Sequence, residues 1–139
     1  EDLVECVSCG IDMFDCALPT RIARNGALFT RRGRVNIRNA RFNEQMEPIS
    51  HDCGCYTCRS FSAAYLHHLF KCEELLGYRL ATIHNLHFII RLMNQMREAI
   101  SNGTFNQLKR SFLDDFQPVN EEVRITQKAK WVKAQRLRK

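Results

Sequence analysis

The sequence predicts an α/β fold that is mostly helical and carries one small β-hairpin. Apolar residues such as Leu86, Ile90 and Met96 recur at three- and four-residue steps from about residue 82 to residue 100, which is typical of a long amphipathic helix. Two short runs, 27–30 and 34–37, flank a Gly-containing turn and predict a hairpin. A β-branched and aromatic run over 11–18 predicts one further strand.

The chain begins with a predicted helix, since the apolar residues within 3–7 are spaced for one helical face. The strand over 11–18 follows, and Pro19 is expected to stop it. Because the first residue is Glu1 and the helix pattern starts in mid-stride, we expect the chain to be cut from a longer one.

Three helices are predicted after the hairpin. The first covers about 60–72, and the second begins near Thr82 and closes at Gly103. Thr104 can cap the third, which runs to about residue 116. The remaining residues, 118–139, form a basic tail that either adds nonspecific affinity for a polyanion or is a solvated charged helix.

Charge and composition narrow the class of protein. Of 139 residues, 45% are hydrophobic and 26% are charged, which is close to the globular average. The net charge of +6 makes a polyanion a plausible partner. No run of eighteen apolar residues occurs, and the start lacks a signal-peptide pattern, so we expect a cytoplasmic protein without a membrane partner.

The segment HDCGCYTC contains the strongest local signal, because it brings Cys53, Cys55 and Cys58 within six residues. This spacing favours one tetrahedral zinc ion, and four protein ligands would make its role structural. The fourth ligand must come from elsewhere in the chain. The histidines are His51, His67, His68, His84 and His87.

His84 is the preferred fourth ligand. His51 lies too close along the chain to wrap the loop, and the adjacent pair at 67 and 68 points to two helix faces. Two alternatives stay open: three cysteines without a metal, or a second redox or metal pair formed by Cys6 and Cys9.

Asp15 and the two arginines after it are the other candidate functional residues. Asp15 ends the predicted strand among apolar neighbours, so it is either a hydrogen-bonded loop carboxylate or a reactive one. Arg21 and Arg24 are three residues apart in TRIARNG, a spacing that suits phosphate or a guanine edge but also a basic surface turn.

Several motifs together resemble one family. They are GIDMFDCALPTRIARNG, NIRNARF, the cysteine cluster, SAAYLHHL and TIHNL. In this order they resemble the queuine tRNA-ribosyltransferases, also called tRNA-guanine transglycosylases, in their bacterial form, over about residues 1–117. The resemblance implies a (β/α)8 barrel with a zinc-binding subdomain inserted after the last strand. Because a complete barrel needs about 250 residues, this chain would be its C-terminal part.

The resemblance also implies a division of the chain. The last barrel helix and strand, with the catalytic aspartate and an RNA-recognition loop, would cover 1–26. The zinc-binding insertion would cover 27–81, closing helices 82–117 and the basic tail 118–139. The remainder of the barrel would hold the base pocket and a second catalytic aspartate.

The implied activity is exchange of the wobble guanine of tRNAs with GUN anticodons for preQ1, in queuosine biosynthesis. Asp15 would be the nucleophile that forms a covalent bond to ribose, as in a retaining glycosidase. One structural zinc ion per chain would be held by Cys53, Cys55, Cys58 and His84. The implied RNA-binding residues are Thr20, Arg21, Ile22, Ala23 and Arg24.

Phe61, Tyr65 and His68 align with an aromatic patch through which family members form homodimers. From their spacing alone they are equally suited to the core face of a helix. The alternative to the enzyme is a noncatalytic, zinc-stabilised tRNA-binding module or subunit.

Overall fold

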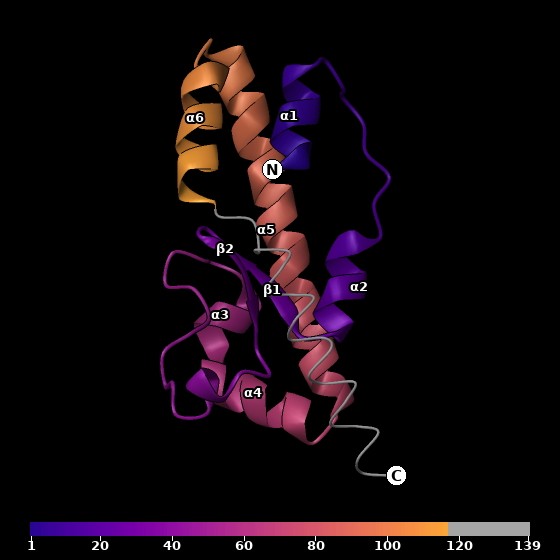
Figure 1. The fold of residues 1–139 in the computed structure, drawn as a ribbon, viewed down its shortest axis with the longest axis vertical. Coiled ribbons are helices and arrows are strands. Elements are labelled where there is room, and N and C mark those ends of the chain that lie inside the picture. The colour runs from indigo at the N-terminus through magenta and orange to yellow at the C-terminus, as the bar shows by residue number, and fades with distance from the viewer. Residues whose placement is uncertain (117–139) are drawn as a thin grey trace, which may run out of the picture.

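A single long helix organises the molecule. The computed structural model describes residues 1–116, and the other elements pack along the long helix in Figure 1. In chain order the elements are α1 (Asp2–Ser8), α2 (Leu18–Arg24), β1 (Ala27–Thr30), β2 (Gly33–Asn36), the 3-10 turn η1 (Ala40–Phe42), α3 (Tyr56–Ser60), α4 (Ala63–Lys71), the long helix α5 (Leu75–Ser101) and α6 (Phe105–Asp115).

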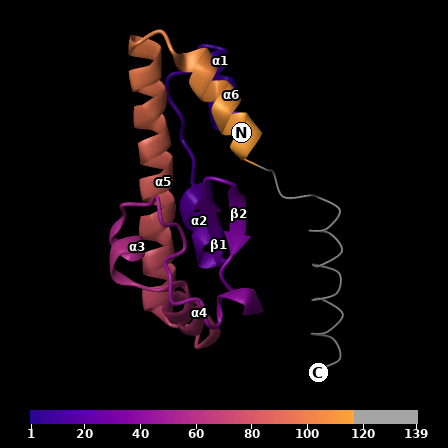
Figure 2. The same cartoon turned by 90° about the vertical axis from the view of Figure 1, so that its left-hand side faces the viewer.

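Two hydrophobic clusters lie along α5. The larger cluster joins α2, the hairpin, α4 and the first part of α5, and its buried members include Leu28, Ile37 and Phe70. The smaller cluster joins α1, α5 and α6 around Val4, Leu92 and Met96. Figure 2 shows the same division, with α1 and α6 beside one end of α5 and α2, the hairpin, α3 and α4 beside the other.

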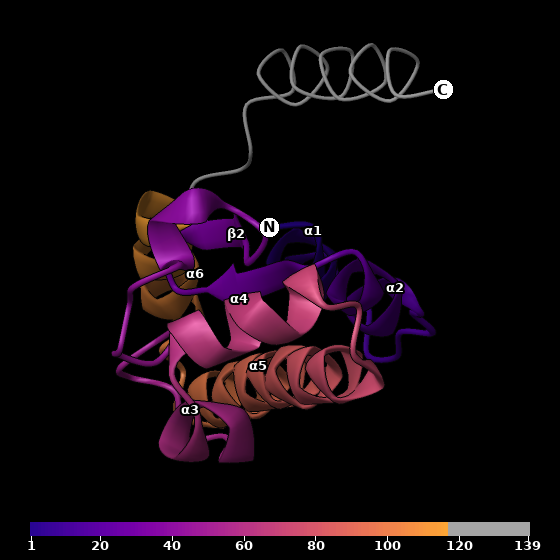
Figure 3. The same ribbon diagram turned by 90° about the horizontal axis from the view of Figure 1, so that it is seen from below.

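The predicted hairpin is confirmed. β1 and β2 pair antiparallel, with Ala27 opposite Asn36 and Thr30 opposite Gly33. The second strand lies one residue earlier than predicted, because Gly33 pairs with Thr30 at the turn and the strand ends at Asn36. The Ile37 amide, just beyond the strand, still bonds the Gly26 carbonyl. Figure 3 shows the same arrangement from below, and β1 packs directly on α5, where the Phe29 amide bonds the Asn85 side chain.

The predicted strand over 11–18 is wrong for this chain. Residues 11–17 are an irregular segment that forms no ladder with the described residues, and a strand requires a partner for its backbone groups. Ile11 and Met13 stay exposed, Met13 by 88% of its surface. Most of the segment expected to be an RNA-recognition loop is helical, because α2 begins at Leu18, where Pro19 occupies the first turn that proline favours.

The long helix begins seven residues earlier than predicted. Gly77 suggested a break in the helix, yet it lies inside α5. A Cβ added at this position would come within 3.0 Å of the Leu69 Cβ in α4. The glycine therefore allows two helices to approach closely. The expected apolar face is wrong in part: Met96 is buried, whereas Leu86, Ile90 and Ile100 are exposed.

The helix predicted over 60–72 is confirmed as α4, which begins three residues later than predicted and follows the short helix α3, which the sequence analysis did not predict. α3 ends at Ser60, and Ser62 starts α4 by accepting a hydrogen bond from the Tyr65 amide at 3.1 Å. Thr104 does precede α6 as predicted, but its hydroxyl donates to the Ala99 carbonyl of α5 and does not cap α6. The basic tail, 118–139, lies outside the described residues.

Candidate metal centre

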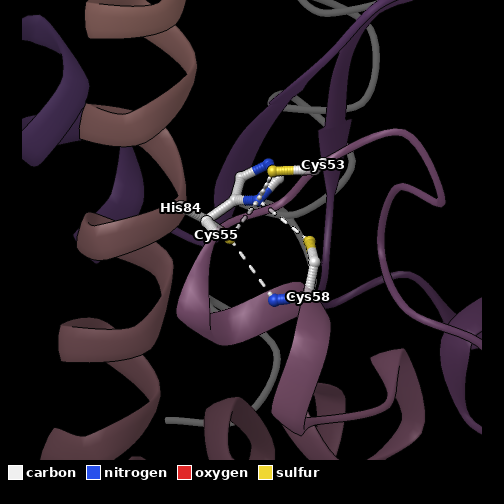
Figure 4. A group of neighbouring side chains, drawn as sticks. All are labelled: Cys53, Cys55, Cys58 and His84. Carbon is white, nitrogen blue, oxygen red and sulfur yellow. Dashed lines mark hydrogen bonds between the residues drawn. The ribbon is translucent and has the colours of Figure 1, made fainter.

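Three elements bring four sulfur and nitrogen ligands together. Cys53 lies in the loop before α3, Cys55 is the N-cap of α3, and Cys58 lies within that helix. His84 comes from α5, 26 positions beyond Cys58. Their ligand atoms all lie within 4.8 Å of one another, and Figure 4 shows the side chains converging on one point.

The distances fit a tetrahedral ion. His84 Nδ1 lies 3.7 Å from the Cys53 sulfur, 3.6 Å from the Cys55 sulfur and 3.3 Å from the Cys58 sulfur. Zinc bonds of about 2.3 Å to sulfur and about 2.0 Å to nitrogen, at tetrahedral angles, require nitrogen–sulfur separations of about 3.6 Å. The cluster therefore has the ligand types and the dimensions of a closed zinc site.

The orientation of His84 is set by the hairpin. Its Nε2 donates to the Phe29 carbonyl oxygen in β1 at 2.7 Å. Because a carbonyl only accepts, Nε2 carries a proton, and Nδ1 is the ring nitrogen that faces the sulfurs and is left to bind a metal. The ring is almost completely buried. The hairpin thus selects the tautomer that can bind a metal.

The thiols and the imidazole of the cluster influence one another's pKa values, as expected for a cation-binding site. The hydrogen bond with Cys53 lowers the pKa of the Cys55 thiol far below its usual range, whereas Cys53 and Cys55 raise the pKa of the Cys58 thiol far above it. Burial opposes protonation of His84, but hydrogen bonds with the Cys53 and Cys55 sulfurs outweigh it and raise the pKa of His84 to about 10. A divalent cation among the sulfurs would stabilise several thiolates at once.

The other histidines do not join the cluster. His67 is buried, and its Nδ1 donates to the Ile37 carbonyl oxygen at 2.7 Å, so it holds α4 to the end of the hairpin. His51 is exposed and lies 3.9 Å from a carboxylate oxygen of Glu47. Cys6 and Cys9 are free thiols at the end of α1. Among residues 1–116 no other group of three or more metal-ligating side chains comes together.

Three polar residues that support the cluster were missed by the sequence analysis. The buried Thr57 hydroxyl donates to the Leu80 carbonyl at 2.7 Å and ties α3 to α5. Arg91 of α5 donates to the Asp52 carbonyl at 2.6 Å and holds the loop that precedes Cys53. Asn85, next to His84, bonds both the hairpin and α2. The only sequence signal for it was a polar pair inside the apolar pattern of TIHNL.

The predicted catalytic and RNA-binding residues lie away from the metal centre. The Asp15 side chain is exposed on the irregular segment before α2. α2 presents Arg21 and Arg24 to solvent and buries Ala23, while Thr20 and Ile22 are half-buried. Figures 1 and 2 show α2 and α3 on different sides of α5. These residues and the metal ligands are therefore two separate groups connected through α5.

The predicted dimer residues form part of an exposed aromatic cluster. Phe61 and Tyr65 stack with ring centroids 5.4 Å apart, and Tyr56 meets Phe61 edge-on at 5.6 Å. Phe61 is half-buried against the larger hydrophobic cluster, whereas Tyr65 is 40% exposed. His68 is exposed one turn further along α4, beside the Cys72 sulfur.

The described residues define a mostly helical protein with a β-hairpin and a Cys3His cluster that is consistent with a structural zinc site. A family model described as "Queuine tRNA-ribosyltransferase" matches residues 1–118. The chain belongs to this family. Among residues 1–116, no helix combines the length and apolar character that crossing a bilayer requires.

Bacterial members of the family are close in sequence. A queuine tRNA-ribosyltransferase of Dehalococcoides mccartyi is 61% identical over 132 residues, which cover 95% of this chain and 34% of that relative. The enzyme of Syntrophobacter fumaroxidans is 58% identical over 115 residues, and that of Herminiimonas arsenicoxydans 57% over 115, each covering 83% of this chain and 31% of the relative. The chain thus spans about a third of the length of these curated relatives.

Proposed function

We propose that the chain is the C-terminal part of a tRNA-guanine transglycosylase, which exchanges the wobble guanine of GUN-anticodon tRNAs for preQ1. The family match over residues 1–118 carries this proposal, because it includes Asp15, the TRIARNG segment and all four metal ligands. The proposed division follows the motifs: 1–26 for chemistry and RNA recognition, 27–81 for the zinc-binding insertion and 82–117 for the closing helices.

Asp15 is the proposed nucleophile. Its carboxylate attacks the anomeric carbon of the ribose, and the bond from that carbon to guanine breaks. Guanine leaves with a proton from the second aspartate of the barrel. The incoming base then returns a proton to that aspartate as it bonds to the anomeric carbon and displaces Asp15. Splitting the exchange into two displacements retains the configuration at the sugar.

Thr20, Arg21, Ile22, Ala23 and Arg24 are the proposed RNA-recognition segment. Arg21 and Arg24 are exposed on α2, three residues from each other. Two guanidinium groups on one short helix suit phosphate oxygens or base edges near the anticodon. Their position shortly after Asp15 supports contact with nucleotides that flank the target guanine.

One zinc ion per chain has a structural role in this proposal. Cys53, Cys55, Cys58 and His84 supply four ligands, which leaves no open position for water or substrate. A zinc ion bound by these residues would act as a Lewis acid toward the three thiolates and the imidazole. It would hold the loop, α3 and α5 together and stabilise the subdomain that borders α2.

Exposed apolar surface supports the view that other structure covers this chain. Met13 lies on the irregular segment with 88% of its surface exposed, and Leu86, Ile90 and Ile100 of α5 are also exposed. Exposed apolar side chains gathered on a segment and on a long helix are typical of an interface. The remaining barrel strands and helices are the proposed cover.

The nucleophile is tested in the full-length enzyme with tRNA and a slowly reacting base. We expect a covalent RNA–protein adduct on a denaturing gel, and Asp15→Asn should abolish both the adduct and guanine exchange because an amide is a poor nucleophile. Asp12→Asn, three residues earlier on the same segment, is the matched control and should keep the adduct. An adduct that survives Asp15→Asn would remove Asp15 from its role.

The same experiment distinguishes the enzyme from the alternative, a noncatalytic zinc-stabilised tRNA-binding module. This alternative predicts tRNA binding by the zinc-loaded protein with no exchange and no adduct, irrespective of residue 15.

A further inference from the structure

Asn85 has an unusual set of partners for a side chain inside a helix. It is fully buried in α5. Its Oδ1 accepts from the Phe29 amide of β1 at 3.0 Å, and its Nδ2 donates to the carbonyls of Ala27 and Pro19, each at 3.0 Å. One amide group therefore bonds three backbone groups that are 56 to 66 positions away along the chain.

The bond to Pro19 reaches the first turn of α2. This helix has only seven residues, and a helix of that length is marginal in water without tertiary contacts. Pro19 and Ala23 are buried, while Arg21 and Arg24 are exposed on the other face. The direction in which the arginines point thus depends on how the buried face of α2 is held.

The far end of α2 is held by the hairpin. Gly26 has a φ of 82°, and its carbonyl accepts from the Ile37 amide at 2.8 Å. Asn85 also bonds both neighbours of Leu28 in β1, through Ala27 and Phe29. The side chain consequently sets the first turn of α2 relative to the strand that follows it.

We propose that Asn85 is a positioning residue that aims α2, and with it Arg21 and Arg24, at the RNA. This inference rests on the proposed function, since it assigns α2 to substrate recognition. Asn85 touches neither RNA nor base; it acts through the backbone of α2. Its neighbour His84 bonds the carbonyl of the same Phe29 whose amide Asn85 bonds, so the metal centre and α2 are held through consecutive residues of α5.

Asn85→Asp isolates the two donated hydrogen bonds. Aspartate has nearly the same shape and can still accept from the Phe29 amide. It cannot donate to the carbonyls of Pro19 and Ala27, and it places a carboxylate oxygen beside two carbonyl oxygens. We expect α2 to shift or fray in this variant while the larger hydrophobic cluster stays packed.

The test is steady-state exchange of labelled guanine by the zinc-loaded full-length enzyme. We expect the KM for tRNA to rise about tenfold in Asn85→Asp. This change corresponds to the loss of about one buried hydrogen bond that holds α2 in its position. The KM for guanine should stay within about twofold, since the base pocket lies elsewhere. A purely structural role would lower the amount of active enzyme and the maximal rate, and would leave both KM values unchanged.

His67→Leu is the matched control. It removes a buried side-chain bond to the Ile37 carbonyl that does not involve α2, and it should lower the melting temperature without raising the KM for tRNA. If Asn85→Asp does not accumulate in folded form, Asn85→Ser replaces it, because the serine hydroxyl is too short to reach both carbonyls. This variant should also raise the KM for tRNA and leave the KM for guanine unchanged. Unchanged KM for tRNA in a folded, zinc-loaded Asn85 variant overturns the inference. Absence of exchange in the unmodified enzyme would instead reject the proposed function.

Discussion

Glu73 adopts a backbone conformation that suits glycine. Its φ is 57°, and it follows the C-cap of α4, where the Glu74 amide bonds the Leu69 carbonyl at 2.9 Å. α5 ends in the same motif, with Gly103 at a φ of 69° and the Thr104 amide bonded to the Ala99 carbonyl at 2.8 Å. The left-handed residue after a helix is usually glycine, because a Cβ is strained there.

We therefore expect Glu73→Gly to stabilise the zinc-loaded protein by about 0.5–1 kcal/mol, measured as the free energy of unfolding in urea. Gly103→Ala is the opposite change in the same motif. Nothing lies within 4 Å of the added Cβ, so its expected cost of about 1 kcal/mol is backbone strain alone. If both substitutions changed the free energy of unfolding in the same direction, strain at the left-handed position would not be the cause.

At the scale of the element, α3 depends on the metal centre. It has five residues, which are too few for a stable isolated helix. Cys55 caps it by accepting from the Cys58 amide at 3.3 Å, so the same sulfur serves as helix cap and as ligand. The contacts that hold α3 are thus concentrated in the cluster and in the bond from Thr57 to Leu80.

We expect about one zinc per chain by metal analysis, and Cys55→Ser should lose the metal and most of the folded yield. A structural site can supply on the order of 10 kcal/mol of folding free energy, more than the stability of many domains. Cys72→Ser changes an exposed thiol outside the cluster and should keep the full zinc content. Full metal and normal stability in Cys55→Ser would exclude the zinc site.

At the scale of the whole molecule, exposed aromatic surface gathers on one region of α3 and α4. Tyr65 stacks on Phe61, and Tyr56 completes the cluster. Phe61 also packs against the larger hydrophobic cluster, so its substitution would disturb the fold as well as an interface. Tyr65 is the better probe of the proposed dimer because it is more exposed.

We expect Tyr65→Ser to weaken dimerisation of the full-length enzyme by about tenfold, since aromatic anchors dominate the energy of interfaces. Sedimentation velocity over a concentration series measures the change. Met46→Ser replaces an apolar side chain that is 78% exposed in the loop before α3, and it should leave the dimer intact. A dimer unaffected by Tyr65→Ser would place the interface elsewhere.

The sequence by itself determined the features that depend on residues near one another along the chain. The three cysteines lie within six residues, so a compact turn can bring their sulfurs together, and the hairpin is encoded by two short strands around a glycine turn. Both were predicted at the correct residues to within one position. The histidine ligand was also predicted, but from the weaker argument of excluding its alternatives.

Only the tertiary structure decided the features that depend on distant partners. Gly77 lies inside α5, where its missing side chain lets α4 pack closely, and residues 11–17 form no strand because no described segment pairs with them. The tautomer of His84 and the three bonds of Asn85 depend on β1 and α2, more than fifty positions away. Spacing along the chain determines which nearby side chains can come together. Packing between distant segments determines which backbone groups form hydrogen bonds with those side chains.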